Sequence, residues 1–200
     1  AQLWHAGLDW ESDLAPVAAC PPREQSVLLH QMETGFGCVD TSSMGRLFDA
    51  VSSLTGVRQR VDYEAQAAIE LEGVSRGVDS AGSRYTFDWT QSDDDSWTAD
   101  PRSVIRAVVR DLREKLPAEV IGARFHESVA HLVLEWAIRG RELAGVDEVV
   151  LTGGVFQNPL LLVRACALLS DAGFTPLTGL ELPPNDGGLA YGQVLVGSSS

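Results

Sequence analysis

The stretch V-V-L-T-G-G-V-F-Q-N, from Val149 to Asn158, decides the fold expected for this chain. Its first four residues are typical of a short buried strand, which Gly153 and Gly154 then end. The run from Pro159 to Ala172 predicts a helix. A strand, a Gly-Gly turn and a helix N-terminus in this order bring backbone N–H groups up to a phosphate, because glycine has no Cβ to hold the ligand away. The alternative is a plain turn between a strand and a helix.

A second Gly-Gly pair occurs near the end, in P-P-N-D-G-G-L-A from Pro183 to Ala190. Asp186 stands in front of the pair, and a last helix is expected from Gly187 to Val196. We therefore expect a site between the two turns.

Composition and charge limit the classes of protein to which this chain can belong. With 200 residues, 44% hydrophobic and 22% charged, the chain predicts a soluble globular protein of one or two domains with a real core. The net charge of −13, from 28 acidic and 15 basic side chains, argues against general binding to nucleic acid or to an anionic membrane. A local basic pocket stays open as an alternative.

The protein is expected in the cytoplasm, with its cysteines in the reduced state. No apolar run approaches the roughly 20 residues that span a bilayer, and no signal peptide is recognised. Cys20, Cys38 and Cys166 are odd in number and form no C-x-x-C pair, which favours reduced thiols over disulfides or cysteine-bound zinc.

The second informative stretch is T-S-S-M-G-R-L-F-D-A-V-S-S-L-T-G, from Thr41 to Gly56. Its apolar spacing predicts a helix capped by a serine and ended by Gly56. Gly45, Arg46 and Asp49 lie off the apolar face in the first two turns. Two interpretations remain: a solvated helix face, or a helix N-terminus facing a ligand whose ribose hydroxyls donate to the carboxylate.

The remaining segments predict further helices and strands. Helices are expected at 23–33, 63–72, 101–115 and 117–144, and strands at 83–89, from 97, and at 173–177. The acidic run 91–96 is expected to be a solvated hairpin tip, because it lacks the spacing of a calcium loop. His126 and His131 are interpreted as structural.

Four ordered motifs, T-S-S-M-G-R-L-F-D-A-V, Y-E-A-Q-A-A-I-E-L-E, T-G-G-V-F-Q-N and P-P-N-D-G-G-L-A, resemble the C-terminal part of the HypF carbamoyltransferases of [NiFe]-hydrogenase maturation. The resemblance covers nearly all of the chain. It implies an α/β lobe of the actin/sugar-kinase/Hsp70-like (ASKHA) fold with a helical portion. This branch is shared with tRNA threonylcarbamoyl-adenosine synthases and antibiotic O-carbamoyltransferases, and its nucleotide lies between two lobes.

The resemblance also implies an activity. A carbamoyl-adenylate is made elsewhere in HypF from carbamoyl phosphate and ATP. Its carbamoyl group passes to the C-terminal cysteine thiolate of a partner, HypE, and later becomes a cyanide ligand. An enzyme of the carbamoyltransferase class, with no membrane partner, is therefore expected.

Site residues follow by matching motifs. The resemblance implies nucleotide contacts from Gly153, Gly154 and Asn158 in the adenylate-binding turn, Asp49 at the ribose, Glu70 as a second acid, and Gly45 and Arg46 beside Asp49. Asp186 resembles the carboxylate ligand of a divalent metal, zinc or iron, which two histidines of an upstream lobe complete. No catalytic residue is assigned.

The chain departs from the family pattern in two ways. Ala65 stands where the family usually has glycine, which predicts hindered backbone approach. The upstream lobe, with its histidine pair, and the other HypF domains are not found, so residues 1–200 are interpreted as the C-terminal lobe, a fragment or a separately encoded part. The alternatives are a lobe of an O-carbamoyltransferase or of a tRNA threonylcarbamoyl-type transferase, and a nucleotide-binding module without catalysis of its own.

Overall fold

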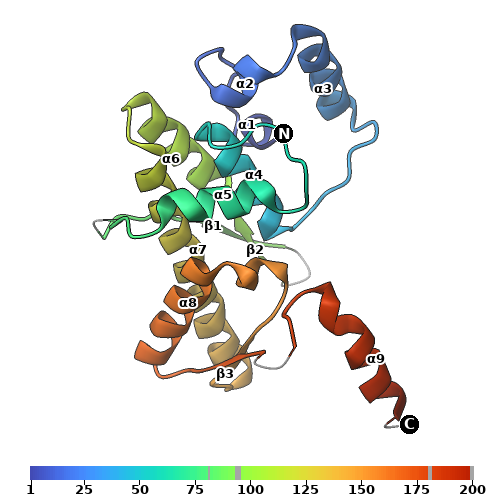
Figure 1. Ribbon diagram of the computed structural model, residues 1–200, viewed down its shortest axis with the longest axis vertical. Helices are drawn as coiled ribbons and strands as arrows, with labels where there is room; N and C mark the ends of the chain where they lie inside the picture. Colours follow the sequence, from blue (N-terminus) through green and yellow to red (C-terminus); the bar gives the residue numbers. More distant parts are fainter. Residues whose placement is uncertain (81, 93–95, 180–181, 199–200) are drawn as a thin grey trace. The chain divides into compact units, whose positions relative to one another are not determined.

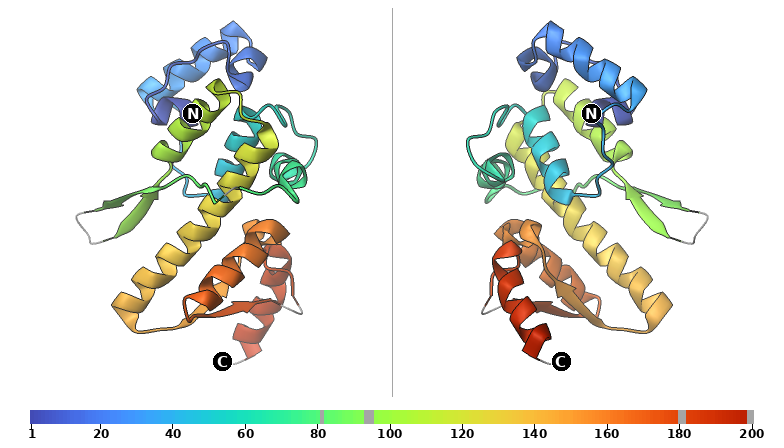
Figure 2. Two further views of the ribbon diagram at one scale, coloured as in Figure 1. Left: turned by 90° about the vertical axis from the view of Figure 1, so that its left-hand side faces the viewer. Right: turned by 90° about the vertical axis from the view of Figure 1, so that its right-hand side faces the viewer.

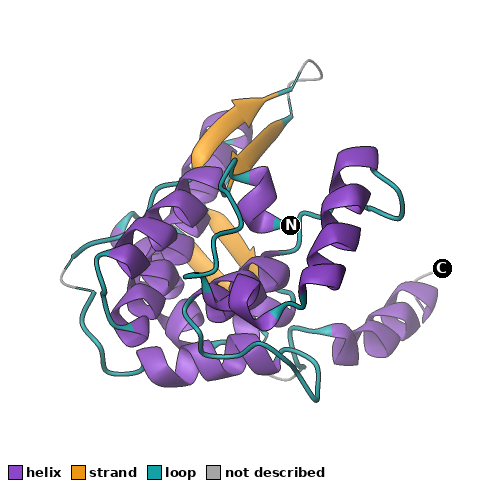
Figure 3. Ribbon diagram, turned by 90° about the horizontal axis from the view of Figure 1, so that it is seen from above, coloured by secondary structure: helices purple, strands orange, loops and turns teal. Residues whose placement is uncertain are grey.

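Two compact units, Ala1–Phe125 (unit 1) and His126–Ser200 (unit 2), make up the chain. The computed structural model describes residues 1–200 except 81, 93–95, 180–181 and 199–200. In chain order the elements are α1 (Gln2–His5), α2 (Ala15–Ala19), α3 (Pro22–Thr34), α4 (Met44–Leu54), α5 (Gln66–Ser75), β1 (Asp88–Gln91), β2 (Trp97–Asp100), α6 (Arg102–Arg113), α7 (Ala118–Ala144), β3 (Glu148–Leu151), η1 (Gly154–Gln157), α8 (Pro159–Asp171), β4 (Thr175–Thr178), η2 (Asp186–Gly188) and α9 (Leu189–Ser198) (Figure 1, Figure 3).

The core of unit 1 forms between helices whose apolar residues recur at helical spacing. Val104, Ile105 and Val108 of α6 are completely buried. The rings of Phe48 on α4 and Phe125 on α7 meet edge to face, with centroids 4.8 Å apart and planes at 70°. This geometry is favourable for two aromatic rings, so α4 and α7 are held at a defined contact.

Helices α5 and α7 approach each other closely at Gly122. A Cβ on Gly122 would lie 2.1 Å from the Oγ of Ser75, which is itself buried and donates a hydrogen bond of 2.7 Å to the carbonyl of Leu71. Because real Cβ atoms do not come so near a neighbour, any larger residue at 122 has to displace Ser75.

A buried polar cluster ties the segment before the hairpin to α6 and α7. The carboxylate of Asp111, which is 3% exposed, accepts from the Tyr85 hydroxyl at 2.9 Å and from Arg124 Nη1 at 2.7 Å. Burial, together with the Asp111 carboxylate, raises the pKa of Tyr85, so its phenol stays neutral. The strand expected at 83–89 begins only at Asp88, after the buried Tyr85 and Phe87. It pairs antiparallel with β2, as predicted (Figure 2).

Unit 2 is a small α/β arrangement around a parallel pair of strands. β3 and β4 pair from Glu148↔Thr175 to Leu151↔Thr178. Leu151 is 3% exposed, and α8 packs against β4. Helix α8 lies along the unit 2 part of α7 (Figure 2), where Arg164 Nη2 contacts Glu127 Oε1 at 2.7 Å.

The other face of this sheet carries apolar side chains in the open. Val150 and Leu177 are register partners with exposed fractions of 66% and 41%. Helix α9 has no buried residue, although its composition is apolar. Parallel sheets ordinarily have both faces covered, so this apolar surface is unusual for a unit that stands alone.

Most predicted elements are present, and two predicted boundaries are wrong. The helix expected from residue 63 begins at Gln66, because the backbone of Ala65 is left-handed at φ 61°. The strand expected at 83–89 is instead Asp88–Gln91. The helix expected at 159–172 is confirmed as α8 (Pro159–Asp171), and the 3₁₀ turn η1 lies between it and the first Gly-Gly pair. Part of the predicted acidic hairpin tip, residues 93–95, lies outside the described residues.

Candidate functional site

The turn after β3 depends on glycine at one position. Gly153 has φ 102° and ψ 156°, a region open almost only to glycine. Asn158 then ends η1 and caps α8, because its Oδ1 accepts from the N–H of Leu161 at 3.0 Å. The α8 N-terminus therefore begins after Asn158 rather than at Gly154, and the backbone nearest the Gly-Gly pair belongs to η1.

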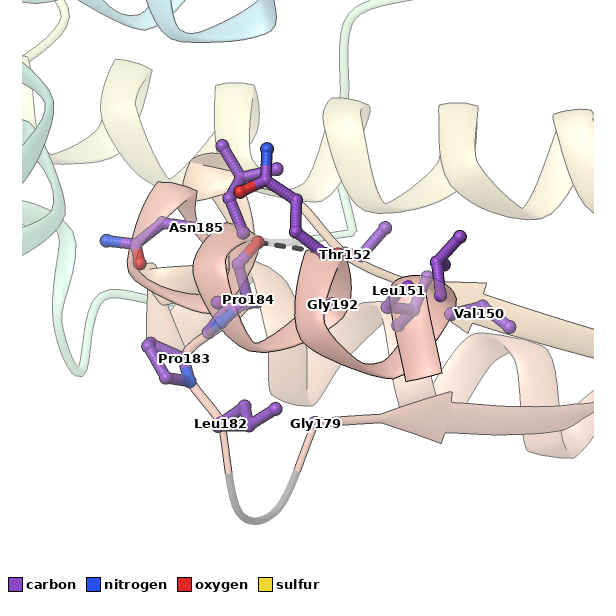
Figure 4. A pocket seen from close by; sticks show the side chains of 14 residues that line it. Val150, Leu151, Thr152, Gly179, Leu182, Pro183, Pro184, Asn185 and Gly192 are labelled. Carbon is purple, nitrogen blue, oxygen red and sulfur yellow. Dashed lines mark hydrogen bonds between the residues drawn. The ribbon is translucent and has the colours of Figure 1, made fainter. Parts of the chain in front are cut away.

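The second Gly-Gly turn lies directly against the first. The N–H of Gly153 donates to the carbonyl of Pro184 at 2.6 Å, and the Thr152 hydroxyl donates to the same oxygen at 3.4 Å (Figure 4). The side chain of Asn185 caps η2 by accepting from the Gly187 N–H at 3.0 Å. The structure thus brings together the two turns that the sequence singled out.

Asp186 occupies the first position of η2 and is exposed. Since the cap is supplied by the neighbouring Asn185, the side chain of Asp186 is not the cap of this turn. Its carboxylate is accessible to a ligand.

A cleft of about 820 Å³ opens beside the two turns (Figure 4). Its lining is mostly apolar and comes from β3, the segment before η2 and α9: Val150, Leu151, Thr152, Gly179, Leu182, Pro183, Pro184, Asn185, Gly188, Leu189, Gly192, Gln193, Val196 and Gly197. Volumes of this size hold small organic ligands, and the few polar groups at the turn end supply orientation.

In unit 1 the predicted residues gather at the start of α4. Ser43 caps this helix, with its Oγ accepting from the Arg46 N–H at 3.4 Å. Arg46 is largely exposed and its Nη1 lies 3.6 Å from the Asp49 carboxylate, which is itself 35% exposed. Gly45 lies in the same turn. Asp49 is therefore held by a weak surface ion pair and is open to hydroxyl donors.

Glu70 has protein partners that the sequence did not reveal. Its Oε1 lies 3.0 Å from Arg58 Nη2 and accepts from Gln66 Nε2 at 2.9 Å. The side chain of Gln66, 4% exposed, also accepts from the Asp62 N–H at 2.7 Å. Helix α5 packs on α4, so Glu70 and Asp49 come from neighbouring helices.

The left-handed Ala65 gives a stability prediction. A Cβ in this conformation costs about 1–2 kcal/mol, while glycine loses about 0.4–1 kcal/mol more chain entropy on folding. Ala65→Gly is expected to raise the free energy of unfolding of unit 1 by about 0.5–1 kcal/mol, measured by urea titration. Ala68→Gly, inside α5, is the matched control and should lower the same quantity by about 1 kcal/mol. Equal losses at both positions would contradict the prediction.

Two ionisable residues of α7, His126 and Glu127, make polar contacts with the segment that follows the first Gly-Gly turn. His126 is 4% exposed, and its Nε2 lies 2.9 Å from the Asn158 amide nitrogen. Hydrogen bonds of 2.8 and 2.7 Å from the Arg164 guanidinium lower the pKa of Glu127 and keep it ionised. The sequence predicted a structural role for His126 but gave no sign of its contact with Asn158, which lies 32 residues away.

The described residues also include candidate metal ligands and thiols. Within the described residues, no three or more His, Cys, Asp or Glu side chains are grouped to hold a metal ion. Asp186 can donate one oxygen, and the described residues by themselves do not complete a metal site. Burial raises the pKa of the Cys166 thiol, which disfavours its thiolate. Among the described helices, none combines the length and apolarity needed to cross a membrane.

Comparison with known proteins gives a match over most of the chain. Residues 1–193 match the family model described as carbamoyltransferase, Kae1-like domain, second subdomain. The chain is similar to the carbamoyltransferase HypF of Synechocystis, at 37% identity over 78% of this chain and 19% of that protein. It is also similar to HypF2 of Cupriavidus necator, at 36% identity over 78% of this chain and 22% of that protein. The chain thus spans about a fifth of each of these relatives.

Solved structures agree with this match. A full-length HypF in a phosphate- and nucleotide-bound form superposes with a TM-score of 0.88 and 32% identity, covering 99% of this chain and 31% of that one. HypF of T. kodakarensis shares the fold, with a TM-score of 0.74 at 22% identity, over 96% of this chain and 24% of that one. The predicted α/β lobe of ASKHA type with a helical portion is confirmed.

Proposed function

We propose a role for this chain from the premise that it belongs to the carbamoyltransferase HypF family. In this proposal residues 1–200 supply the nucleotide-facing C-terminal lobe of the Kae1-like domain. That domain transfers a carbamoyl group from carbamoyl-adenylate to the C-terminal cysteine of a HypE-type protein during maturation of the cyanide ligands of [NiFe]-hydrogenase. The protein would act in the cytoplasm.

The observation that carries the proposal is the contact between the two Gly-Gly turns at the mouth of the apolar cleft. The hydrogen bond from the Gly153 N–H to the Pro184 carbonyl holds the two turns together beside the cleft. An adenylate has the matching chemistry, because its base is flat and largely apolar and its phosphate accepts from backbone N–H groups.

We assign the remaining nucleotide contacts from the family motifs and from exposure. Asp49 is accessible and is proposed to accept from ribose hydroxyls, with Gly45 and Arg46 beside it. Glu70 is proposed as a second nucleotide-contacting acid, oriented by Arg58 and Gln66. A carboxylate that is already oriented by its neighbours loses less entropy when a ligand binds.

In the proposed reaction the acceptor thiolate attacks the carbamoyl carbon, so that a C–S bond forms and the C–O bond to the adenylate phosphate breaks. AMP leaves with the electron pair of that bond. The part of this chain is to bind and orient the adenylate and to exclude water from it with the apolar lining of the cleft.

A divalent metal, zinc or iron, is part of the proposal, with Asp186 as one oxygen ligand. Two histidines from the first subdomain would complete the site. When bound, such an ion would neutralise phosphate charge. The exposed position of Asp186, next to the turn contact, supports this assignment.

The apolar surface of unit 2 supports the proposal of a lobe that works with a first subdomain. Leu177 on the open sheet face and Val194 on α9, which are not among the residues that line the cleft, are exposed by 41% and 68%. Covering such side chains with further polypeptide would stabilise the domain by about 25 cal/mol per Å² of apolar area.

A second candidate is a nucleotide-binding module without catalysis of its own. It is favoured by one observation, the single carboxylate at a metal position that the described residues do not complete. Transfer of a carbamoyl-type group to tRNA is disfavoured by the net charge of −13.

Isothermal titration of the 200-residue chain with AMP tests the proposal. We expect millimolar affinity, about −4 kcal/mol, because a ligand shared with a first subdomain loses half of its contacts. Inorganic phosphate alone should bind more weakly. Gly154→Ala should weaken AMP binding without loss of stability, since its Cβ would meet open space and its φ is not positive. Gly153→Ala should also lower stability.

Two results would count against this proposal. Absence of AMP binding at about 10 mM would remove the nucleotide role. Micromolar affinity of the isolated chain would show that no further lobe is needed for binding.

A further inference from the structure

Both polar atoms of the Asn158 side-chain amide make contacts within the protein. Its Oδ1 accepts from the N–H of Leu161 at 3.0 Å, which is the N-cap bond of α8. Its Nδ2 lies 2.9 Å from His126 Nε2. Because a helix N–H can only donate, the cap bond fixes the oxygen toward α8 and turns the NH₂ group toward the imidazole.

This orientation fixes the protonation of His126. An amide NH₂ only donates, so Nε2 has to accept with its lone pair. The proton of the neutral ring is then on Nδ1. An imidazolium would place an N–H donor against the amide donors, and His126, at 4% exposed, has little water to compensate for that clash.

We propose that His126 is a positioning residue for the first Gly-Gly turn, and that it acts as a neutral Nδ1–H imidazole through Asn158. Asn158 ends η1 and begins α8, and its own N–H donates to Val155 at 3.2 Å. Holding this one side chain therefore fixes where η1 stops, and with it the backbone of residues 153–157. The structural part stands on its own, and the effect on ligand affinity rests on the proposed nucleotide function.

The first experiment reads the proton directly. Long-range ¹H–¹⁵N correlation spectra of the 200-residue chain should show His126 as the Nδ1–H tautomer near neutral pH. Asn158→Asp keeps an N-cap side chain but cannot donate, so Nε2 of His126 should become protonated. An Nε2–H tautomer in the unchanged chain, or no change in Asn158→Asp, would overturn the proposal.

The second experiment separates two effects of the His126 side chain, its hydrogen-bond acceptor and its volume. His126→Phe fills the space without an acceptor, whereas His126→Gln retains one. Amide exchange at Leu161 and AMP affinity, both followed by NMR, should change at least about fivefold in His126→Phe and less than about threefold in His126→Gln. His131→Gln is the matched control, since His131 lies on the same helix and pairs with Glu127 at 3.0 Å. It should leave both readouts unchanged.

The outcomes distinguish the two proposals. If the unchanged chain does not bind AMP, the nucleotide function fails, while the tautomer and the Leu161 exchange still decide the role of His126. Equal effects of His126→Phe and His126→Gln, in folded variants, would show that the ring only fills space.

Discussion

Asp186→Ala, made in a protein that carries the whole Kae1-like domain, is expected to reduce carbamoyl transfer to the thiol acceptor by more than about 100-fold. Hydrolysis of carbamoyl phosphate, which the resemblance to HypF assigns to other domains, should be retained. Bound metal, measured on the same folded protein, should fall in parallel. The physical reason is charge, because the proposed imidazole partners are neutral and the carboxylate is the anionic ligand.

The structure supplies the controls for this experiment. Asn185, and not Asp186, caps η2, so Asn185→Ala should cost about 1 kcal/mol of stability without loss of metal. Asp171→Ala removes an exposed carboxylate at the end of α8 and controls for net charge. If Asp186→Ala retains wild-type metal content and transfer, Asp186 is not a ligand.

The substitution Phe125→Ala is expected to have the largest effect on stability. Phe125 is completely buried and meets Phe48 edge to face at 4.8 Å. Removing a buried aromatic ring costs about 3–5 kcal/mol, through lost transfer free energy and the cavity left behind. Because natural domains are stable by only about 5–15 kcal/mol, unit 1 should be close to unfolding in this variant. Thermal and urea denaturation, followed by circular dichroism, measure the change.

A double-mutant cycle isolates the ring contact. Phe48→Ala and Phe125→Ala, alone and together, should show a coupling of about 0.5–1.5 kcal/mol beyond the loss of buried area. Phe125→Leu is the milder control and should cost less than Phe125→Ala. A loss below about 1 kcal/mol in Phe125→Ala would show that the core at this point rearranges easily.

Local signals account for what the sequence predicted well. The helical spacing of apolar residues predicts α6, and the Gly-Gly pair predicts the turn after β3. Both are found where expected. Both Gly-Gly pairs are visible in the sequence, and the structure brings the two turns into contact. Ala65, which stands where the family usually has glycine, has a left-handed backbone that the sequence did not predict.

Contacts between distant residues account for what was missed. The pairing of His126 with Asn158, and of Arg58 with Glu70, joins side chains that share no periodic pattern. The close approach of Gly122 to Ser75 depends on how α5 and α7 pack, and an isolated glycine in a helix does not reveal its neighbour. The start of α8 at Pro159 was predicted, whereas the 3₁₀ turn η1 between the Gly-Gly pair and this helix was not.

The open face of the β3–β4 sheet also bears on how the chain behaves at high concentration. At neutral pH the net charge of −13 makes copies repel one another, and this repulsion offsets the attraction between exposed apolar faces. Near the sequence pI of about 4.6 the repulsion vanishes. Colloidal solubility of the isolated chain therefore depends on its charge. Acidity or high salt should reduce it, because the exposed apolar side chains, such as Leu177, can then associate with those of other copies.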